Sequence, residues 1–310
     1  MAALRLEQPQ RAQGHTGEAG HSSMKTVLCA TSEAIPKLTQ DDQALIRPLA
    51  DRGIQAMAAV WSDPSVPWTS ADAVIIRSCW DYHLRLEDFL RWVAWLEQAG
   101  VRVWNRPSVL RWNADKIYLR GLERKGVAIV PTVWPEAGFS LADKMRDLGW
   151  EKAVVKPRVS ATAYRTQVTT KKAADGGQEL LDALLRGPGA MVQQFMDTVI
   201  TRGEWSVVFF AGQFSHAVIK RPKAGDFRVQ HDFGGSEIPT KAPDSVIEAA
   251  RRAVAAVESV PLYARVDGVE CDGRFLLMEL ELLEPALFLK SSAGAADRFA
   301  EAIEGALQSH

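Results

Sequence analysis

The first third of the chain alternates between short apolar runs and segments with helical spacing. Apolar, β-branched runs predict strands, and apolar residues that recur every three or four positions predict helices. Strands are therefore expected at residues 26–30, 54–61, 73–77 and 101–104, and helices at 41–52 and 86–98. Strands that alternate with helices are typical of βαβ units, so this part is predicted to form a parallel sheet.

After residue 112 the pattern favours a connecting helix and a smaller mixed lobe. Asn113 is a good N-cap and Gly126 is a usual helix stop, which together predict a helix over 113–125. Beyond this helix, strands are expected at 153–156, 165–169 and 191–195, and a helix at 177–185.

The last third has the pattern of paired strands covered by helices. Strands are expected at 204–210, 213–219, 262–269 and 275–283, and helices at 245–257 and 293–307. The sequence therefore predicts an α/β fold with α+β lobes. Its expected parts are a leader (1–23), a first domain (24–112), a central lobe (113–203) and a last lobe (204–310).

Charge and composition narrow the class of protein. The 37 Lys and Arg residues balance the 38 Asp and Glu residues, so nothing points to nucleic acid or a membrane as a partner. The three cysteines show neither zinc spacing nor a disulfide framework, and no apolar stretch reaches the roughly 18 residues of a membrane helix. Residues 1–23 lack the apolar stretch of a secretory signal and are expected to form a disordered leader. A cytoplasmic protein is expected.

The strongest chemical signal lies on two neighbouring strands. Arg265 and Asp267 are two residues apart on one expected strand, and Glu279 and Glu281 are two apart on the next. Side chains two apart face the same side of a strand, so pairing of the strands would bring all four together. Carboxylates this close repel unless a cation neutralises them, and hard oxygen ligands suit Mg²⁺. Because the flanking residues are apolar, a metal site is favoured over an exposed charged face.

Two lysines are placed where a phosphate could bind. Lys116 lies near the start of the connecting helix, and Lys156 ends an apolar run and precedes a loop of small residues at 160–163. Taken singly, each is more typical of an ordinary surface lysine. Neither G-x-x-x-x-G-K-[ST] nor G-x-G-x-x-G occurs, which excludes a Walker A loop and gives no support to a dinucleotide site.

An adenine site is a further hypothesis. The apolar run at 191–196 could present backbone groups and a Met-Phe pair to the ring, and Glu204 could bind ribose hydroxyls. A plain core strand is an equal alternative for this run.

A polar and aromatic cluster follows an apolar strand of the first domain. Ligands of open α/β sheets bind beyond the carboxyl ends of strands. Arg77 could therefore hold a substrate carboxylate and Asp81 an amino group, with Trp80 and Tyr82 as walls. A structural corner that packs the two aromatics is the equal alternative. His231 is a further candidate substrate contact.

In their order along the chain, these signals resemble the ATP-grasp superfamily, specifically its glutathione-synthetase-like and ribosomal-protein-modification-ligase-like branch. The resemblance covers about residues 105–285, and the first domain is similar to the family's pre-ATP-grasp domain. It implies a site for ATP with Mg²⁺, which Mn²⁺ could replace, and a homodimer, because dimers are common in that family.

The resemblance also implies a role for each matching residue. The residues matched to ATP contacts are Lys116 and Lys156 for phosphates, Gln194 and Met196 for adenine, and Glu204 for ribose. The residues matched to metal ligands are Asp267, Glu279 and Glu281, and the family often has Asn at the third position. Arg265 matches the arginine that steadies the acyl phosphate, while Lys220 and Arg228 match basic residues that reach the transferred phosphate or the substrate.

The implied activity is that of an ATP-dependent ligase. Such an enzyme converts a small, amino-acid-like carboxylate to an acyl phosphate and couples it to a nitrogen nucleophile, giving ADP and phosphate. The Trp-Asp-Tyr cluster and the Glu-Leu-Glu-Leu-Leu-Glu-Pro run are also similar to the cycloserine-forming cyclo-ligase branch, which closes O-ureido-D-serine to a ring. A non-catalytic ATP-binding sensor or partner module is the alternative of another class, and the intact set of matched metal ligands argues against it.

Overall fold

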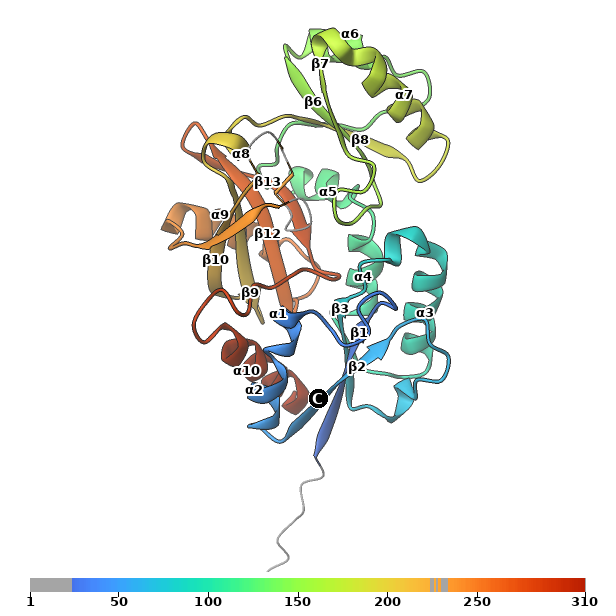
Figure 1. The fold of residues 1–310 in the computed structure, drawn as a ribbon, viewed down its shortest axis with the longest axis vertical. Coiled ribbons are helices and arrows are strands. Elements are labelled where there is room, and N and C mark those ends of the chain that lie inside the picture. The colour runs from blue at the N-terminus through green and yellow to red at the C-terminus, as the bar shows by residue number, and fades with distance from the viewer. Residues whose placement is uncertain (1–23, 224–225, 227, 230–233, 310) are drawn as a thin grey trace, which may run out of the picture.

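The computed structural model describes residues 24–223, 226, 228–229 and 234–309, which form three sheets with helices packed around them (Figure 1). In Figure 1 the sheet of the first domain lies lowest, that of the last lobe lies in the middle and that of the central lobe lies uppermost. No described helix is long and apolar enough to cross a membrane.

The first sheet is parallel, as the alternation of strands and helices predicts. Its order is β2-β1-β3-β4, with β1 at Lys25–Thr31, β2 at Ile54–Val60, β3 at Ala73–Ser78 and β4 at Val103–Trp104. Its helices are α1 (Gln40–Gln43), α2 (Ile46–Ala50) and α3 (Leu86–Gln98), with 3₁₀ turns at Trp68–Ser70 and Tyr82–Leu84. The single helix predicted over 41–52 is divided in two, because Pro48 has no N–H to donate to the carbonyl of Ala44.

The connector also contains two helices where one was predicted. They are α4 (Pro107–Asn113) and α5 (Tyr118–Arg124). Asn113 was expected to cap a single helix, and this prediction is wrong. Its side chain instead donates to the carbonyl of Leu280 at 2.8 Å and accepts from the N–H of Leu282 at 2.8 Å. Asn113 therefore ties the connector to the last lobe.

The central lobe is an antiparallel sheet with a core of its own. The order is β5-β8-β6-β7, with β5 at Thr132–Val133, β6 at Lys152–Pro157, β7 at Gln167–Thr170 and β8 at Ala190–Gln194. The helices are α6 (Leu141–Asp147) and α7 (Ala174–Leu185), with a 3₁₀ turn at Lys171–Ala173. The helix α6 was not predicted, although Ser140 is a typical N-cap and accepts from the N–H of Asp143.

The last lobe is a five-stranded antiparallel sheet in the order β11-β10-β9-β12-β13. Its strands are β9 (Glu204–Phe210), β10 (Gln213–Arg221), β11 (Ser236–Pro239), β12 (Tyr263–Cys271) and β13 (Arg274–Glu281). The short α8 (Thr198–Thr201) precedes it, α9 (Asp244–Ala255) contacts β12 and β13, and the closing α10 (Ala295–Gln308) contacts β9, β10 and α2.

The first domain and the last lobe share one apolar core. Val27 and Ile75 of the parallel sheet belong to the same buried cluster as Tyr263 and Phe299. Polar contacts reinforce this junction. Asn105 donates to the carbonyl of Tyr263 at 3.0 Å and accepts from the N–H of Leu262. Most of the core of the central lobe consists of residues from 133 to 192. Met191 of β8 instead packs into the buried cluster of the last lobe. The domain boundaries expected at 112/113 and 203/204 stay predictions.

His216 on β10 holds the segment that follows β13. Its Nε2 lies 2.9 Å from the carbonyl oxygen of Leu287, and its Nδ1 lies 2.9 Å from the hydroxyl of Ser215. Burial lowers the pKa of His216 to about 4, although the backbone carbonyls of Leu287 and Phe288 oppose this shift. The imidazole is therefore neutral in the folded protein at neutral pH.

This shift makes stability depend on pH. The folded pKa is below that of the unfolded chain, so the stabilisation is complete above the unfolded pKa and is lost as the pH falls toward the folded value. From pH 7.5 to pH 5, the free energy of unfolding is expected to decrease by about 2 kcal/mol through this residue. Urea denaturation at both pH values measures the change, with His216→Gln as the comparison. An equally large decrease in His216→Gln would contradict the assignment.

Candidate active site

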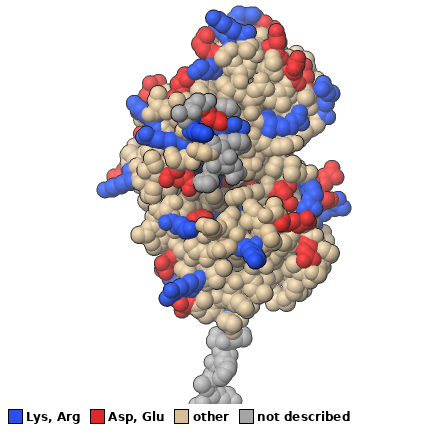
Figure 2. All heavy atoms as spheres, viewed as in Figure 1, with Lys and Arg blue, Asp and Glu red and all other residues tan. Residues whose placement is uncertain are grey.

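A cavity of about 280 Å³ brings together side chains from all three parts of the chain. The space-filling view shows a notch between the upper lobe and the body of the molecule, and charges of both signs are mixed over this face (Figure 2). The residues that line the cavity and were predicted from sequence are Trp80, Tyr82, Lys116, Lys156, Gln194, Met196, Glu204, Lys220, Arg228, Arg265, Asp267, Glu279 and Glu281.

The charged floor of the cavity is built by β12 and β13. Asp267 pairs with Glu279 across the two strands, and Arg265 pairs with Glu281, as the spacing predicted. The register shifts directly after Asp267, at Gly268. A Cβ at Gly268 would lie 2.4 Å from the ring of Phe275, so only glycine fits there. The bulge therefore fixes the register of the charged pairs.

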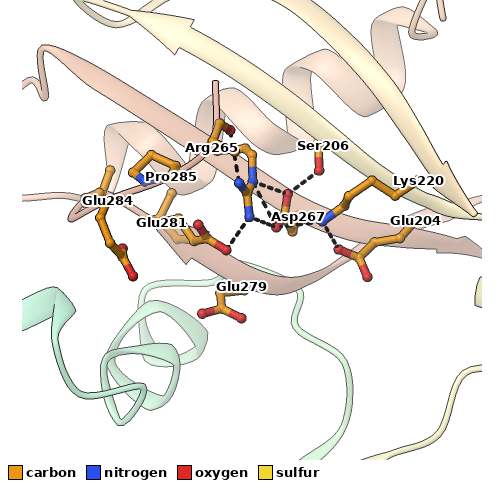
Figure 3. Close-up of polar contacts among 12 residues, drawn as sticks. Glu204, Ser206, Lys220, Arg265, Asp267, Glu279, Glu281, Glu284 and Pro285 are labelled. Atoms are coloured by element: carbon orange, nitrogen blue, oxygen red, sulfur yellow. Dashed lines mark hydrogen bonds and ion pairs between the residues drawn. The ribbon is translucent and has the colours of Figure 1, made fainter. Parts of the chain in front are cut away.

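Asp267 is the centre of the polar network (Figure 3). It accepts from the hydroxyl of Ser206 at 2.5 Å, from the ammonium of Lys220 at 3.1 Å and from the guanidinium of Arg265 at 2.9 Å. Burial alone would raise the pKa of Asp267, but Arg265 and Lys220 outweigh burial and hold this pKa well below its usual range. Asp267 is therefore ionised throughout the neutral pH range.

Lys220 and Arg265 each connect Asp267 to a second carboxylate. Lys220 lies 2.6 Å from Glu204, and Arg265 forms an ion pair with Glu281. Arg265 also donates to the carbonyl of Ala286 at 3.0 Å. Because Lys220 and Arg265 each bridge two carboxylates, they hold these side chains together on one face of the sheet.

The two predicted phosphate lysines face the floor from the connector and the central lobe. Lys116 donates to the carbonyl of Ser160 at 2.6 Å and lies 3.1 Å from Glu279. Lys156 donates to Gln193 at 3.1 Å. Burial lowers the pKa of Lys156, and the nearby Lys116 adds to this effect while Glu279 opposes it. An anion bound between the two lysines would relieve their repulsion.

The donor set fits a hard divalent cation. The three predicted metal ligands are oxygen donors that line one cavity. Among the described residues no three such side chains converge closely enough to hold an ion, and each of the three is paired with lysine or arginine. Burial raises the pKa of Glu281 to about 8, with Arg265 opposing the rise and Asp267 and Glu279 adding to it. A bound cation would relieve this remaining repulsion.

Two predicted substrate contacts do not reach the cavity. Arg77 is only 1% exposed, and its guanidinium donates to Asp42 at 2.9 Å and to the carbonyl of Pro285 at 2.7 Å. Asp81 accepts from the indole of Trp61 at 2.8 Å and from Arg85 at 3.0 Å. Both side chains are thus occupied by partners within the protein, and this corrects the roles predicted for Arg77 and Asp81. His231 lies outside the described residues.

Some residues of the site were not predicted. Ser206, which donates to Asp267, lies on β9 two positions after Glu204. A polar residue at that spacing within an otherwise apolar strand was the available signal. Gln193, the partner of Lys156, had no such signal. It stands next to Gln194, and nothing in the sequence shows which of the two glutamines contacts the lysine.

Comparisons with known proteins support this picture. The family model for the N-terminal domain of D-cycloserine synthetase DcsG matches residues 27–105. The cycloserine biosynthesis protein DcsG of Streptomyces lavendulae is 28% identical over 292 residues, which cover 89% of this chain and 97% of that protein. The glutathione synthetase of Prochlorococcus marinus (strain MIT 9313) is 36% identical over 148 residues, 47% of this chain and 46% of that enzyme.

The solved structures agree with the sequence relatives. The crystal structure of D-cycloserine synthetase DcsG has a TM-score of 0.82 and 28% identity, covering 91% of this chain and 99% of that one. The D-alanine–D-alanine ligase of Bacillus anthracis in complex with ATP has a TM-score of 0.65 at 17% identity, covers 92% of this chain and 97% of that one, and shows the shared fold. The chain thus has the fold of the ATP-grasp ligases, and its similarity to these enzymes supports an ATP-dependent, ADP-forming carbon–nitrogen ligase.

Proposed function

We propose that the protein activates the carboxylate of a small amino acid and closes it onto a nitrogen of the same molecule, with O-ureido-D-serine as substrate and D-cycloserine as the ring product. One observation carries this proposal. A single cavity joins the paired charges of β12 and β13, the two lysines and the aromatic pair Trp80 and Tyr82. The match to DcsG over most of both chains supports ring closure in particular.

In this proposal the chain's cations bind the triphosphate. Lys116 and Lys156 hold the phosphates from the upper side of the cavity, and Gln194 and Met196 border the adenine. Glu204 binds the ribose, and Lys220 binds the phosphate that is transferred. Asp267, Glu279 and Glu281 would hold Mg²⁺, which supplies charge neutralisation at the phosphates.

Ligation then proceeds in two steps. A carboxylate oxygen of the substrate attacks the γ-phosphorus, the bond to the bridging β–γ oxygen breaks, and ADP leaves. The substrate nitrogen next attacks the acyl carbon, the carbon–oxygen bond to phosphate breaks, and phosphate leaves as the nitrogen loses its proton. Arg265 stabilises the negative charge that develops on the acyl oxygen, assisted by Arg228. Enclosure of the cavity keeps water away from the acyl phosphate.

Ring closure leaves the carbamoyl group of the ureido substrate on the ring nitrogen. Hydrolysis of that carbon–nitrogen bond then consumes one water and releases carbon dioxide and ammonia, which gives D-cycloserine.

The test is Mg²⁺-dependent ADP release with O-ureido-D-serine, amino acids and short peptides, followed by mass analysis of the products. Release with O-ureido-D-serine and a product with the mass of D-cycloserine or its carbamoyl derivative would support the proposal. Release only with two separate substrates would instead support intermolecular ligation. ATP binding without ADP release from any of them would favour the non-catalytic module.

A further inference from the structure

Glu284 differs from every other carboxylate on the floor of the cavity. It follows β13, lines the cavity and is only 8% exposed. Glu204, Asp267, Glu279 and Glu281 each form an ion pair with a lysine or arginine. Within the described part of the chain, no other side chain donates a hydrogen bond to the carboxylate of Glu284 or pairs with it. A buried carboxylate without a direct ion pair is costly, and burial raises the pKa of Glu284 to about 7 although the charge of Lys116 opposes the rise. This position therefore calls for a positive partner.

The backbone at Glu284 is held rigidly by the first domain. The indole of Trp80 donates to the carbonyl of Glu284 at 3.1 Å, and Arg77 donates to the carbonyl of Pro285 at 2.7 Å. Both donors belong to the cluster at the end of β3. The cluster that was predicted to bind substrate therefore supports the segment that carries Glu284.

The position of Glu284 separates it from the nucleotide end. In Figure 3 Glu284 and Glu204 lie at opposite ends of the row of acidic side chains, with Glu281 and Asp267 between them. Glu284 shares its part of the cavity lining with Trp80 and Tyr82, which are large and mostly apolar. Apolar walls around a carboxylate strengthen its attraction for a cation.

We propose that Glu284 binds the α-ammonium group of the substrate amino acid. This inference rests on the proposed function and specifies its substrate class: a carboxylate with a free, positively charged amino group. Binding of the ammonium at Glu284 would direct the substrate carboxylate toward Arg265 and the transferred phosphate. An N-acylated or des-amino carboxylate would lack the group that neutralises Glu284.

The experiment compares Glu284→Gln with the wild-type enzyme in ADP release. The KM for O-ureido-D-serine is expected to rise about 10- to 100-fold, because a hydrogen bond to a charged group is lost, while the KM for ATP stays within about twofold. Glu301→Gln, the same change on the exposed side of α10, is the matched control and should keep both KM values. Replacing a buried carboxylate that has no direct ion pair is not expected to lower the melting temperature, which a thermal scan checks.

A second substrate separates recognition from structural damage. The des-amino analogue 3-(ureidooxy)propanoate should be a poor substrate for the wild type and an equally poor one for Glu284→Gln. The preference for the amino compound should therefore largely disappear in the variant. If the wild-type enzyme is active and Glu284→Gln keeps both the wild-type KM for O-ureido-D-serine and the preference for the amino compound, the ammonium subsite is wrong. The proposed function would then still stand. A wild-type enzyme that releases no ADP with any carboxylate would overturn the proposed function and this inference with it.

Discussion

The Asp267→Asn enzyme is expected to lose Mg²⁺-dependent ADP release by about 10³-fold or more, because phosphoryl transfer depends mainly on electrostatic stabilisation of the charge that develops at the phosphates. Asp267 neutralises both Lys220 and Arg265, and it is a proposed metal ligand. Asparagine keeps the volume and the contact with Ser206 but supplies no charge. Steady-state ADP release measures the loss.

The control for this change is Asp272→Asn in the turn between β12 and β13. Asp272 has a φ of 49°, a conformation that asparagine also tolerates, so the turn should be preserved. Asp272→Asn should retain full activity. Circular dichroism at the assay temperature separates lost chemistry from unfolding in Asp267→Asn. A folded Asp267→Asn enzyme with full activity would rule out the assignment of Asp267 as a metal ligand.

The Arg77→Met protein is expected to be less stable by about 3–5 kcal/mol, the usual cost of breaking a buried ion pair from one side. Arg77 and Asp42 lie 2.8 Å apart, and their side chains are 1% and 5% exposed. Without Arg77 the carboxylate of Asp42 stays buried without a counter-charge. Urea denaturation at pH 7.5 measures the change in the free energy of unfolding.

The double variant Arg77→Met with Asp42→Asn tests the reason for this loss. Removing both charges should restore part of the stability, because the uncompensated carboxylate is gone. If Arg77→Met instead kept wild-type stability and raised only the KM for the substrate, Arg77 would be a substrate contact after all.

The site is predictable from sequence where charged residues and the two-residue period of a strand coincide. The two-residue spacing of Arg265 with Asp267 and of Glu279 with Glu281 placed four charged side chains on one face, and the strand pairing brings them together. The parallel first sheet is confirmed by the strand pairing. The ATP-grasp fold, which the resemblance implied, is confirmed by the structural comparisons. Such patterns depend on local geometry, which a sequence displays directly.

The errors have a different cause, which is competition between local signals and distant partners. Asn113 looks like an N-cap, but the backbone around the end of β13 offers it two hydrogen bonds. Arg77 lies at a strand end where ligands bind, but Asp42 and the carbonyl of Pro285 occupy its guanidinium. Pro285 lies 208 residues away along the chain, so no window of sequence could reveal this contact. The residue roles, the metal ion, the homodimer and the location in the cytoplasm stay predictions.

The junction at Asn105 and Tyr263 has a consequence for how the enzyme would open. Because the first domain and the last lobe share a core, they should move as one rigid body. The central lobe, whose core is separate apart from Met191, is the part able to swing. Lys156 would travel with the moving lobe, whereas Glu284 and Arg265 stay on the fixed body. The amino-acid half of the site would thus be preorganised, and the nucleotide half would be assembled only on closure.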